Sequence, residues 1–229
     1  MLQKKSITQV NFTLMQNSIA DIRRDYMLKS FDESHAANNP FDQFKDWWEE
    51  ATSVEIDEVN AMTLATVDAN GKPAARIVLL KGYTHDGFVF FTNYESAKGQ
   101  ELTANPNAAI LFFWKELERQ IRIEGRVEKI SEADSDAYFH SRPAGSRIGA
   151  WVSPQSKVIP GRSFLEENYQ KLLLQYPDEN QVPRPPHWGG FIVKPESFEF
   201  WQGRSSRLHD RLRFTLTDAG NWTRERLAP

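Results

Sequence analysis

Short apolar segments separated by glycine-containing turns are the feature that most limits how this chain can fold. Met62–Val67 and Ala75–Tyr83 flank the turn Asp68–Pro73, and Phe88–Thr92 follows a second turn at His85–Gly87. Parallel strands need a crossover of a dozen or more residues, so connections this short predict antiparallel pairing. The region is therefore expected to be a meander within an antiparallel sheet or barrel.

Further strands are predicted along the chain. Gln120–Ile130 alternates apolar with charged side chains, which is typical of a half-buried strand. The other predicted strands are Ala108–Trp114, Gly189–Val193, Phe198–Trp201 and Leu212–Leu216. Helices are predicted over Pro40–Ser53, over Ser96–Ala104 with Ser96 as N-cap, from Ser131 onward, and over Phe164–Tyr176. These elements predict a mainly β (α+β) fold: an antiparallel β-barrel of six or more strands with surrounding helices. We expect one domain over residues 36–229, preceded by a polar, flexible arm or lid over residues 1–35.

Composition excludes several classes of protein. The 229 residues contain no cysteine, so disulfides, Cys-based metal sites and thiol nucleophiles are excluded. A net charge of -3 argues against a protein that coats nucleic acid. The longest apolar run, Ala108–Trp114, is too short to span a bilayer, and the N-terminus lacks the apolar region of a secretory signal. We expect a cytoplasmic protein that does not interact with membranes.

Common catalytic motifs are also missing. The sequence has no Gly-x-Gly-x-x-Gly after a strand, no Walker loop, no His-Glu-x-x-His and no Gly-x-Ser-x-Gly. The five histidines lack the spacing of metal ligands, and no metal is expected.

Basic residues within apolar segments indicate anion binding. Arg76 and Lys81 are five positions apart, so in one strand they point to opposite faces and each suits a different anion. Lys98 follows a helix start, where free N–H groups bind anions. Tyr138, Arg142 and Ser146 are spaced by four and would share one helix face as a phosphate clamp. Together these groups suggest two phosphorylated ligands, or one ligand with two phosphates.

The end of the chain carries the densest basic tract. From Trp201 onward there are six Arg against three acidic residues, whereas residues 1–60 hold 6 basic and 11 acidic side chains. The stretch from Trp201 to Arg211 contains three Arg, one His and one Trp. An exposed basic turn is the bland alternative, but the planar donor fork of Arg suits phosphate.

Several stretches resemble the pyridoxine/pyridoxamine 5′-phosphate oxidase family. They are Arg76–Lys81, Phe91–Asn93 with Ser96 and Lys98, Tyr138–Arg142, Ile148–Ser153 with Gln155 and Ser156, Trp201–Arg211, and Arg226–Pro229. The resemblance runs from about residue 20 to the last residue, and the Trp201–Arg211 tract is its most specific part. It implies a split β-barrel and a homodimer with FMN at the interface.

The resemblance also implies roles for individual residues. Arg76 and Lys98 would hold the FMN phosphate, and the rest of the FMN site would be Ile77, Val78, Leu79, Leu80, Lys81, Phe91, Thr92, Ala97, Gln120, Gln155, Ser156, Trp201 and Arg211. The substrate phosphate would be held by Lys81, Tyr138, Arg142 and Ser146. Arg207, Leu208 and His209 would contact the substrate, with Arg207 and His209 as the catalytic pair. The segment Arg23, Arg24, Asp25 and Tyr26 is similar to one that closes over the substrate. Some members carry a second basic residue where this chain has Ala97.

The implied reaction oxidises pyridoxine 5′-phosphate and pyridoxamine 5′-phosphate to pyridoxal 5′-phosphate. A hydride moves from substrate C4′ to FMN N5, and O2 reoxidises the flavin to give H2O2. His209 would act either as a base or as a group that orients the substrate. Two alternatives stay open: another split-barrel flavoenzyme, such as a flavin reductase, and a non-catalytic protein that binds FMN or pyridoxal phosphate.

Overall fold

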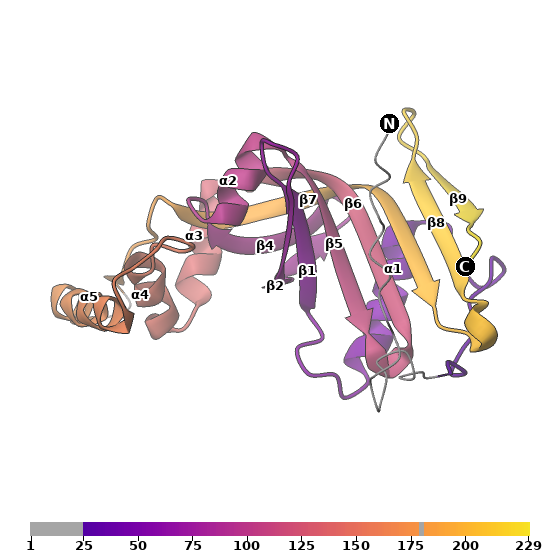
Figure 1. The fold of residues 1–229 in the computed structure, drawn as a ribbon, viewed down its shortest axis with the longest axis horizontal. Helices are drawn as coiled ribbons and strands as arrows, with labels where there is room; N and C mark the ends of the chain where they lie inside the picture. The colour runs from indigo at the N-terminus through magenta and orange to yellow at the C-terminus, as the bar shows by residue number, and fades with distance from the viewer. Residues whose placement is uncertain (1–24, 179–180) are drawn as a thin grey trace, which may run out of the picture.

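A curled antiparallel sheet forms the centre of the molecule (Figure 1). The computed structural model describes residues 25–178 and 181–229; the predicted residues Arg23 and Arg24 lie outside this part of the chain. The strands are β1 (Ala61–Val67), β2 (Pro73–Leu79), β3 (Gly82–Thr84), β4 (Gly87–Asn93), β5 (Asn107–Trp114), β6 (Arg119–Lys129), β7 (Trp188–Gln202), β8 (Asp210–Leu216) and β9 (Trp222–Arg226). The helices are α1 (Pro40–Thr52), α2 (Ala97–Ala104), α3 (Glu132–Ser141), α4 (Ala144–Val152) and α5 (Arg162–Gln175).

Strand order explains why the sheet curls. Neighbouring strands follow the order β2-β1-β5-β6-β7-β4-β3, and every pair is antiparallel. The two ends of this order, β2 and β3, are consecutive in sequence and joined through Leu80 and Lys81. The sheet therefore curls back toward its own first strand, as the predicted barrel requires.

The predicted strand Ala75–Tyr83 is in fact two strands that meet at a bend. Leu80 N donates to Asn60 O (2.8 Å), whereas Lys81 N donates to Val89 O (2.8 Å), so the chain changes partner strand between these two residues. Arg76 and Lys81 do have different surroundings, as expected. The reason is not that odd spacing points the two side chains to opposite faces of one continuous strand. The chain changes its partner strand between Arg76 and Lys81.

The long strand β7 corrects a second prediction. Gly189–Val193 and Phe198–Trp201 were expected as separate strands, but they are the two halves of one strand. The first half pairs with β4 and the second with β8, while β6 pairs along both. A β-bulge places Pro195 opposite Gly125, and this irregularity hides the continuity of the strand from the sequence pattern.

Aromatic side chains fill the barrel. Phe44 of α1 is fully buried against Phe88, Phe112 and Tyr83, and Phe198 and Phe200 of β7 are buried beside them. Asn39 caps α1 by accepting from Phe41 N, and Pro40 begins the helix. This helix thus packs its apolar face against the sheet and contributes Phe41, Phe44, Trp47 and Ala51 to the core.

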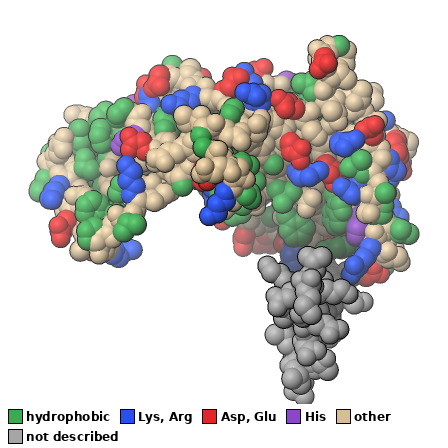
Figure 2. All heavy atoms as spheres, turned by 45° about the horizontal axis from the view of Figure 1, so that its top comes forward, with side chains coloured by type: hydrophobic (Ala, Val, Ile, Leu, Met, Phe, Trp, Pro, Cys, Tyr) green, Lys and Arg blue, Asp and Glu red, His purple; other side chains and the backbone are tan. Residues whose placement is uncertain are grey.

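A separate helical lobe extends from the barrel. Helices α3, α4 and α5 pack around a second apolar cluster that includes Phe139, Ile148 and Trp188. Figure 1 shows this lobe at the opposite end of the molecule from the β8–β9 hairpin. Figure 2 shows a broad hollow between the lobe and the barrel. Within the described residues, no helix is both long and apolar enough to cross a lipid bilayer.

Candidate active site

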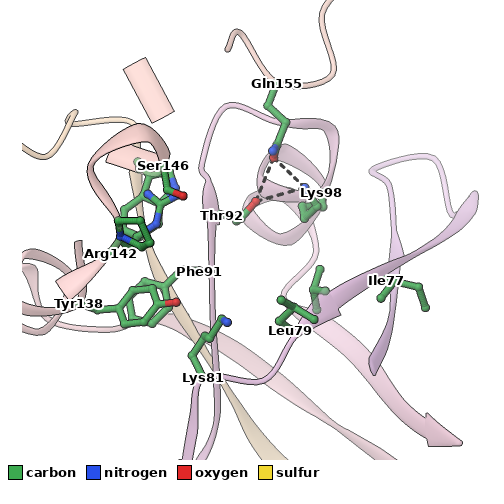
Figure 3. Close-up of a pocket in the computed structure, with 13 residues that line it drawn as sticks. Ile77, Leu79, Lys81, Phe91, Thr92, Lys98, Tyr138, Arg142, Ser146 and Gln155 are labelled. Carbon is green, nitrogen blue, oxygen red and sulfur yellow. Dashed lines mark hydrogen bonds between the residues drawn. The ribbon is translucent and has the colours of Figure 1, made fainter. Parts of the chain in front are cut away.

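A cavity of about 490 Å³ lies between the helical lobe and the strands β2 and β4 (Figure 3). It brings together most of the residues predicted to bind phosphates and FMN. The lining is Ile77, Val78, Leu79, Lys81, Phe91, Thr92, Lys98, Tyr138, Arg142, Pro143, Ser146, Gln155 and Trp188. Three cationic side chains therefore face a single cavity from three different parts of the chain.

Tyr138, Arg142 and Ser146 form one wall of the cavity, but they do not lie on one helix. Helix α3 ends at Ser141, and α4 begins at Ala144 after Arg142 and Pro143. Arg142 has an extended backbone (ψ 151°) at the C-cap of α3, because the following proline disfavours a helical conformation. The prediction of a single helix face is therefore wrong, although the side chains still gather at one site (Figure 3).

The guanidinium of Arg142 is held in place without being neutralised. Its Cζ lies 4.5 Å from the ring centre of Trp188, which gives a cation–π contact. Its Nη1 is buried and has no hydrogen-bond partner among the described residues. Burial lowers the pKa of Arg142, because desolvation disfavours the charged form. A buried donor of this kind fits an anion such as a phosphate oxygen.

Lys98 forms the opposite wall. Helix α2 begins after the N-cap Ser96, whose side chain accepts from Gly99 N. Lys98 Nζ donates to Gln155 Oε1 (2.8 Å) and to Thr92 Oγ1 (3.2 Å), as Figure 3 shows. Burial lowers the pKa of Lys98, and the nearby positive charge of Arg76 lowers it further. An anion placed here would relieve both effects, so this wall also suits a phosphate.

Flat ring surfaces line the rest of the cavity. Phe91 stacks on Tyr138 with ring centres 3.8 Å apart and on Trp188 at 5.4 Å. Ile77 and Leu79 lie across from this stack, and Ile77 is 63% exposed. Sequence reasoning missed Trp188 and Pro143. For Trp188, the available signal was its position directly before the predicted strand Gly189–Val193.

Four of the residues predicted for the FMN site lie on or beside the elements that form the cavity but are not part of its lining. Arg76 Nη2 pairs with Glu101 Oε2 (2.8 Å), which occupies part of its donor fork. Leu80 is buried in the barrel core, Ala97 is the first residue of α2, and Ser156 is exposed with φ 71°. The positive charge of Arg76 still reaches Lys98.

A second group of predicted residues lies at the other end of β7. Gln120, Trp201 and Arg211 are direct neighbours across β6, β7 and β8 and form one row on the sheet. His209 packs against Trp201 with ring centres 4.6 Å apart, and Tyr26 contacts both rings. Arg207 lies in the 3₁₀ turn Ser205–Arg207 with φ 60°, and Leu208 is 70% exposed. We call Tyr26, Trp201 and His209 the ring cluster.

The electrostatics of the ring cluster favour a neutral imidazole. Burial lowers the pKa of His209, and the positive charges of Arg207 and Arg211 lower it further. The Nδ1 atom of His209 accepts from Arg204 N (3.1 Å), so the ring proton is assigned to Nε2. In the described ranges 25–178 and 181–229, no group of three or more His, Asp or Glu side chains is arranged to hold a metal ion.

The cavity and the ring cluster lie at opposite ends of β7. Trp188 at the start of β7 lines the cavity, and Trp201 lies thirteen positions further along the same strand. At about 3.3 Å per residue, the path between them is about 40 Å. The residues predicted to share one ligand therefore fall into two separate groups.

The fold defines a split-barrel class of protein, and the cavity lined by Lys81, Lys98 and Arg142 suits phosphate groups. Family models match residues 48–176, described as "Pyridoxamine 5'-phosphate oxidase", and residues 188–229, described as "Pyridoxine 5'-phosphate oxidase C-terminal dimerisation region". The chain belongs to the pyridoxine/pyridoxamine 5′-phosphate oxidase family and is an oxidoreductase of this FMN-dependent family.

Relatives and solved structures agree with this assignment. Pyridoxine/pyridoxamine 5′-phosphate oxidases of Bordetella petrii and Trichormus variabilis are 58% and 55% identical, over 93% and 94% of this chain and all of each relative. The crystal structure of PhzG from Burkholderia lata, in complex with tetrahydrophenazine-1-carboxylic acid, has a TM-score of 0.83 and 28% identity, covering 90% of this chain and all of PhzG. An FMN-binding protein from Nostoc punctiforme has a TM-score of 0.67 at 20% identity, covering 84% of this chain and all of that one, which supports the fold alone.

Proposed function

We propose that this enzyme oxidises pyridoxine 5′-phosphate and pyridoxamine 5′-phosphate to pyridoxal 5′-phosphate, with FMN as cofactor and O2 as electron acceptor. The observation that carries the proposal is the buried, unpartnered Nη1 of Arg142 beside Tyr138 and Ser146. A donor set of guanidinium, phenol and hydroxyl suits a compact phosphate. Relatives at 53–58% identity that carry this activity in their names support the same substrates.

We assign the two walls of the cavity to two phosphates. Lys81, Tyr138, Arg142 and Ser146 would hold the phosphate of the substrate. Lys98, with the nearby Arg76, would hold the phosphate of FMN, and Gln155 and Thr92 would keep Lys98 aimed at it. We also propose that the backbone at Leu80 and Ala97 and the side chain of Ser156 contact the FMN phosphate or the flavin ring. Fixing a ligand at each phosphate sets the geometry of the reacting rings between them.

We infer that a second copy of the chain completes each site. A ligand in the cavity of one chain would meet the ring cluster, Gln120, Arg207, Leu208 and Arg211 of the other, because the two groups lie at opposite ends of β7. The match of residues 188–229 to a dimerisation region supports a homodimer. The exposed apolar side chains Ile77 and Phe113 (63% and 54% exposed) suit such an interface.

The chain's own residues would hold and orient the substrate. Bound FMN supplies the redox chemistry, namely acceptance of a hydride at N5 and transfer of the electrons to O2 with release of H2O2. Arg207 would fix the pyridine ring through its donor fork. A neutral His209 carries its proton on Nε2, so it would donate a hydrogen bond to the substituent on substrate C4′ or to the 3-hydroxyl oxygen on the pyridine ring.

Oxygen uptake tests the proposal directly. The purified chain is assayed with pyridoxine 5′-phosphate, pyridoxamine 5′-phosphate and unphosphorylated pyridoxine, each with and without added FMN. We expect FMN-dependent uptake and peroxide release with the two phosphorylated substrates and far weaker uptake with pyridoxine. No uptake with either phosphorylated substrate would overturn the proposal, and binding without turnover would favour a carrier.

A further inference from the structure

Residues 25–33, which we call the strap, lie against Trp201 and His209 at the end of β7. The ring of Tyr26 meets Trp201 edge-on with centres 5.7 Å apart and His209 with centres 6.0 Å apart. Phe31 anchors the other end of the strap, because it is buried against Trp47 and Phe200. The strap therefore covers one face of the two rings assigned to the active site.

Gly203 leaves room for this contact. A Cβ atom at residue 203 would lie 2.8 Å from Cγ and 2.9 Å from Cβ of Tyr26, and 3.1 Å from Cβ of Glu118. These atoms of Tyr26 are fixed close to its backbone, so the strap itself would have to move. Glu118 joins the two segments, because its backbone O accepts from Gly203 N (2.7 Å) and its Oε2 accepts from Leu28 N (3.1 Å).

Arg226 holds the far half of the strap from the C-terminal strand β9. Its Nε and Nη2 each lie 2.7 Å from a different carboxylate oxygen of Glu33, which is a bidentate pair. Its Nη1 donates to Asp210 Oδ1 (2.9 Å), and Asp210 Oδ2 accepts from Phe31 N (3.0 Å). Because Asp210 directly follows His209, the same network joins the strap to the ring cluster.

We propose that Gly203 and Arg226 are positioning residues that seat the strap, so that Tyr26 covers Trp201 and His209 while substrate is bound. This inference rests on the proposed function for its substrate, but its structural part stands on the contacts alone. The two residues act by different physics. Gly203 has no side chain, and this leaves space for Tyr26. The side chains of Glu33 and Arg226 are 48% and 38% exposed, so salt weakens their ion pair.

Two variants and a matched control test whether Gly203 and Arg226 position the strap in the full-length, FMN-loaded protein. Gly203→Ala removes the space for Tyr26, and Glu33→Gln breaks the bidentate pair. Glu225→Gln is the control, because Glu225 neighbours Arg226 on β9 but pairs with Arg213, away from the strap. The first measurement is the rate of trypsin cleavage after Lys29, which lies within the strap. The second is the separate effect on KM and kcat for pyridoxine 5′-phosphate.

We expect faster cleavage after Lys29 in both variants, with KM raised about 10-fold by Gly203→Ala and about 3-fold by Glu33→Gln. The effect of Glu33→Gln should shrink at 1 M NaCl, while that of Gly203→Ala should persist. In a Tyr26→Gly background, Gly203→Ala should add little further, because both colliding atoms of Tyr26, Cβ and Cγ, are then absent.

Two results separate failure of the seat from failure of the proposed function. If trypsin cleaves after Lys29 at the same rate in both variants as in Glu225→Gln, the proposed positioning of the strap is wrong, whatever the activity. An undiminished effect of Gly203→Ala without Tyr26 would also overturn it. Absence of oxygen uptake by the wild-type protein would overturn the proposed function instead, and with it the role of the strap toward substrate.

Discussion

The two ends of β7 differ in how complete they are within one chain. The cavity at the Trp188 end has one buried donor without an acceptor, because Arg142 Nη1 has no partner among the described residues. Burial lowers the pKa of both Arg142 and Lys98 there. At the Trp201 end, the ring cluster is already packed, and the strap covers it through Gly203 and Arg226. The Trp188 end is therefore suited to bind an anion, and the Trp201 end presents ring faces and a neutral imidazole.

The largest effect is expected at the unpartnered guanidinium. Arg142→Ala should lower kcat/KM for the phosphorylated substrates about 100-fold, since losing one partner of a buried charge pair costs roughly 2–5 kcal/mol. Steady-state oxygen uptake measures this. Arg162→Ala is the control, because Arg162 is 87% exposed and pairs with Glu166 one turn along α5. A loss at Arg142 no larger than that of the control would contradict the assignment of the substrate phosphate.

A smaller effect is expected at the far end of β7. Arg207→Ala should lower kcat/KM about 30-fold, by about 2 kcal/mol, since it removes a charged hydrogen bond to substrate but leaves the cavity intact. FMN affinity should not change. Unchanged turnover would contradict the proposed contact between Arg207 and the substrate.

FMN affinity should separate the two walls of the cavity. Lys98→Ala should weaken FMN binding about 10-fold, since a charge-assisted hydrogen bond contributes roughly 1.5–3 kcal/mol. Quenching of flavin fluorescence on titration measures the Kd. Lys157→Ala is the matched control, because Lys157 is exposed and pairs with Glu95 nearby. If Arg142→Ala weakened FMN binding more than Lys98→Ala, the two phosphate assignments would have to be exchanged.

The smallest expected effect is a shift in one titration. The pKa of His209 should lie below the ordinary histidine value, and Arg207→Gln should raise it, because the Arg207 charge contributes to the lowering. NMR titration of the imidazole protons measures both. The unfolded chain binds this proton more readily, so His209 should make stability rise with pH through the range between its folded and ordinary pKa values. A raised pKa in the wild-type protein would contradict the neutral imidazole.

Much of the fold follows from the sequence, because turn chemistry and strand alternation are local. The turn at Asp68–Pro73 and the alternation of Gln120–Ile130 predicted β1 and β6 to within a few residues, whereas the predicted strand Ala75–Tyr83 joined β2 to β3. β7 was split because Pro195 interrupts the pattern at a bulge. β9 was missed because Trp222–Arg226 is mostly polar and lies at the sheet edge.

The candidate site shows the same division. The spacing by four predicted that Tyr138, Arg142 and Ser146 share one helix face. They do line one cavity, but the chain leaves the helix before Pro143, so they do not lie on one helix. The pairing of Arg76 with Glu101 and the contact of Trp188 with Arg142 join residues far apart in sequence. Such contacts depend on the curl of the sheet, which no local pattern encodes.

The central claim is that each site joins the cavity of one chain to the ring cluster of another. Arg142→Ala and Arg207→Ala chains, each with a different affinity tag, are co-expressed, and the mixed dimer is purified. A mixed dimer has one site with both lesions and one with none, so the account predicts about half of wild-type oxygen uptake from two variants that are each impaired alone. Uptake no higher than that of the two parent variants would contradict a shared site.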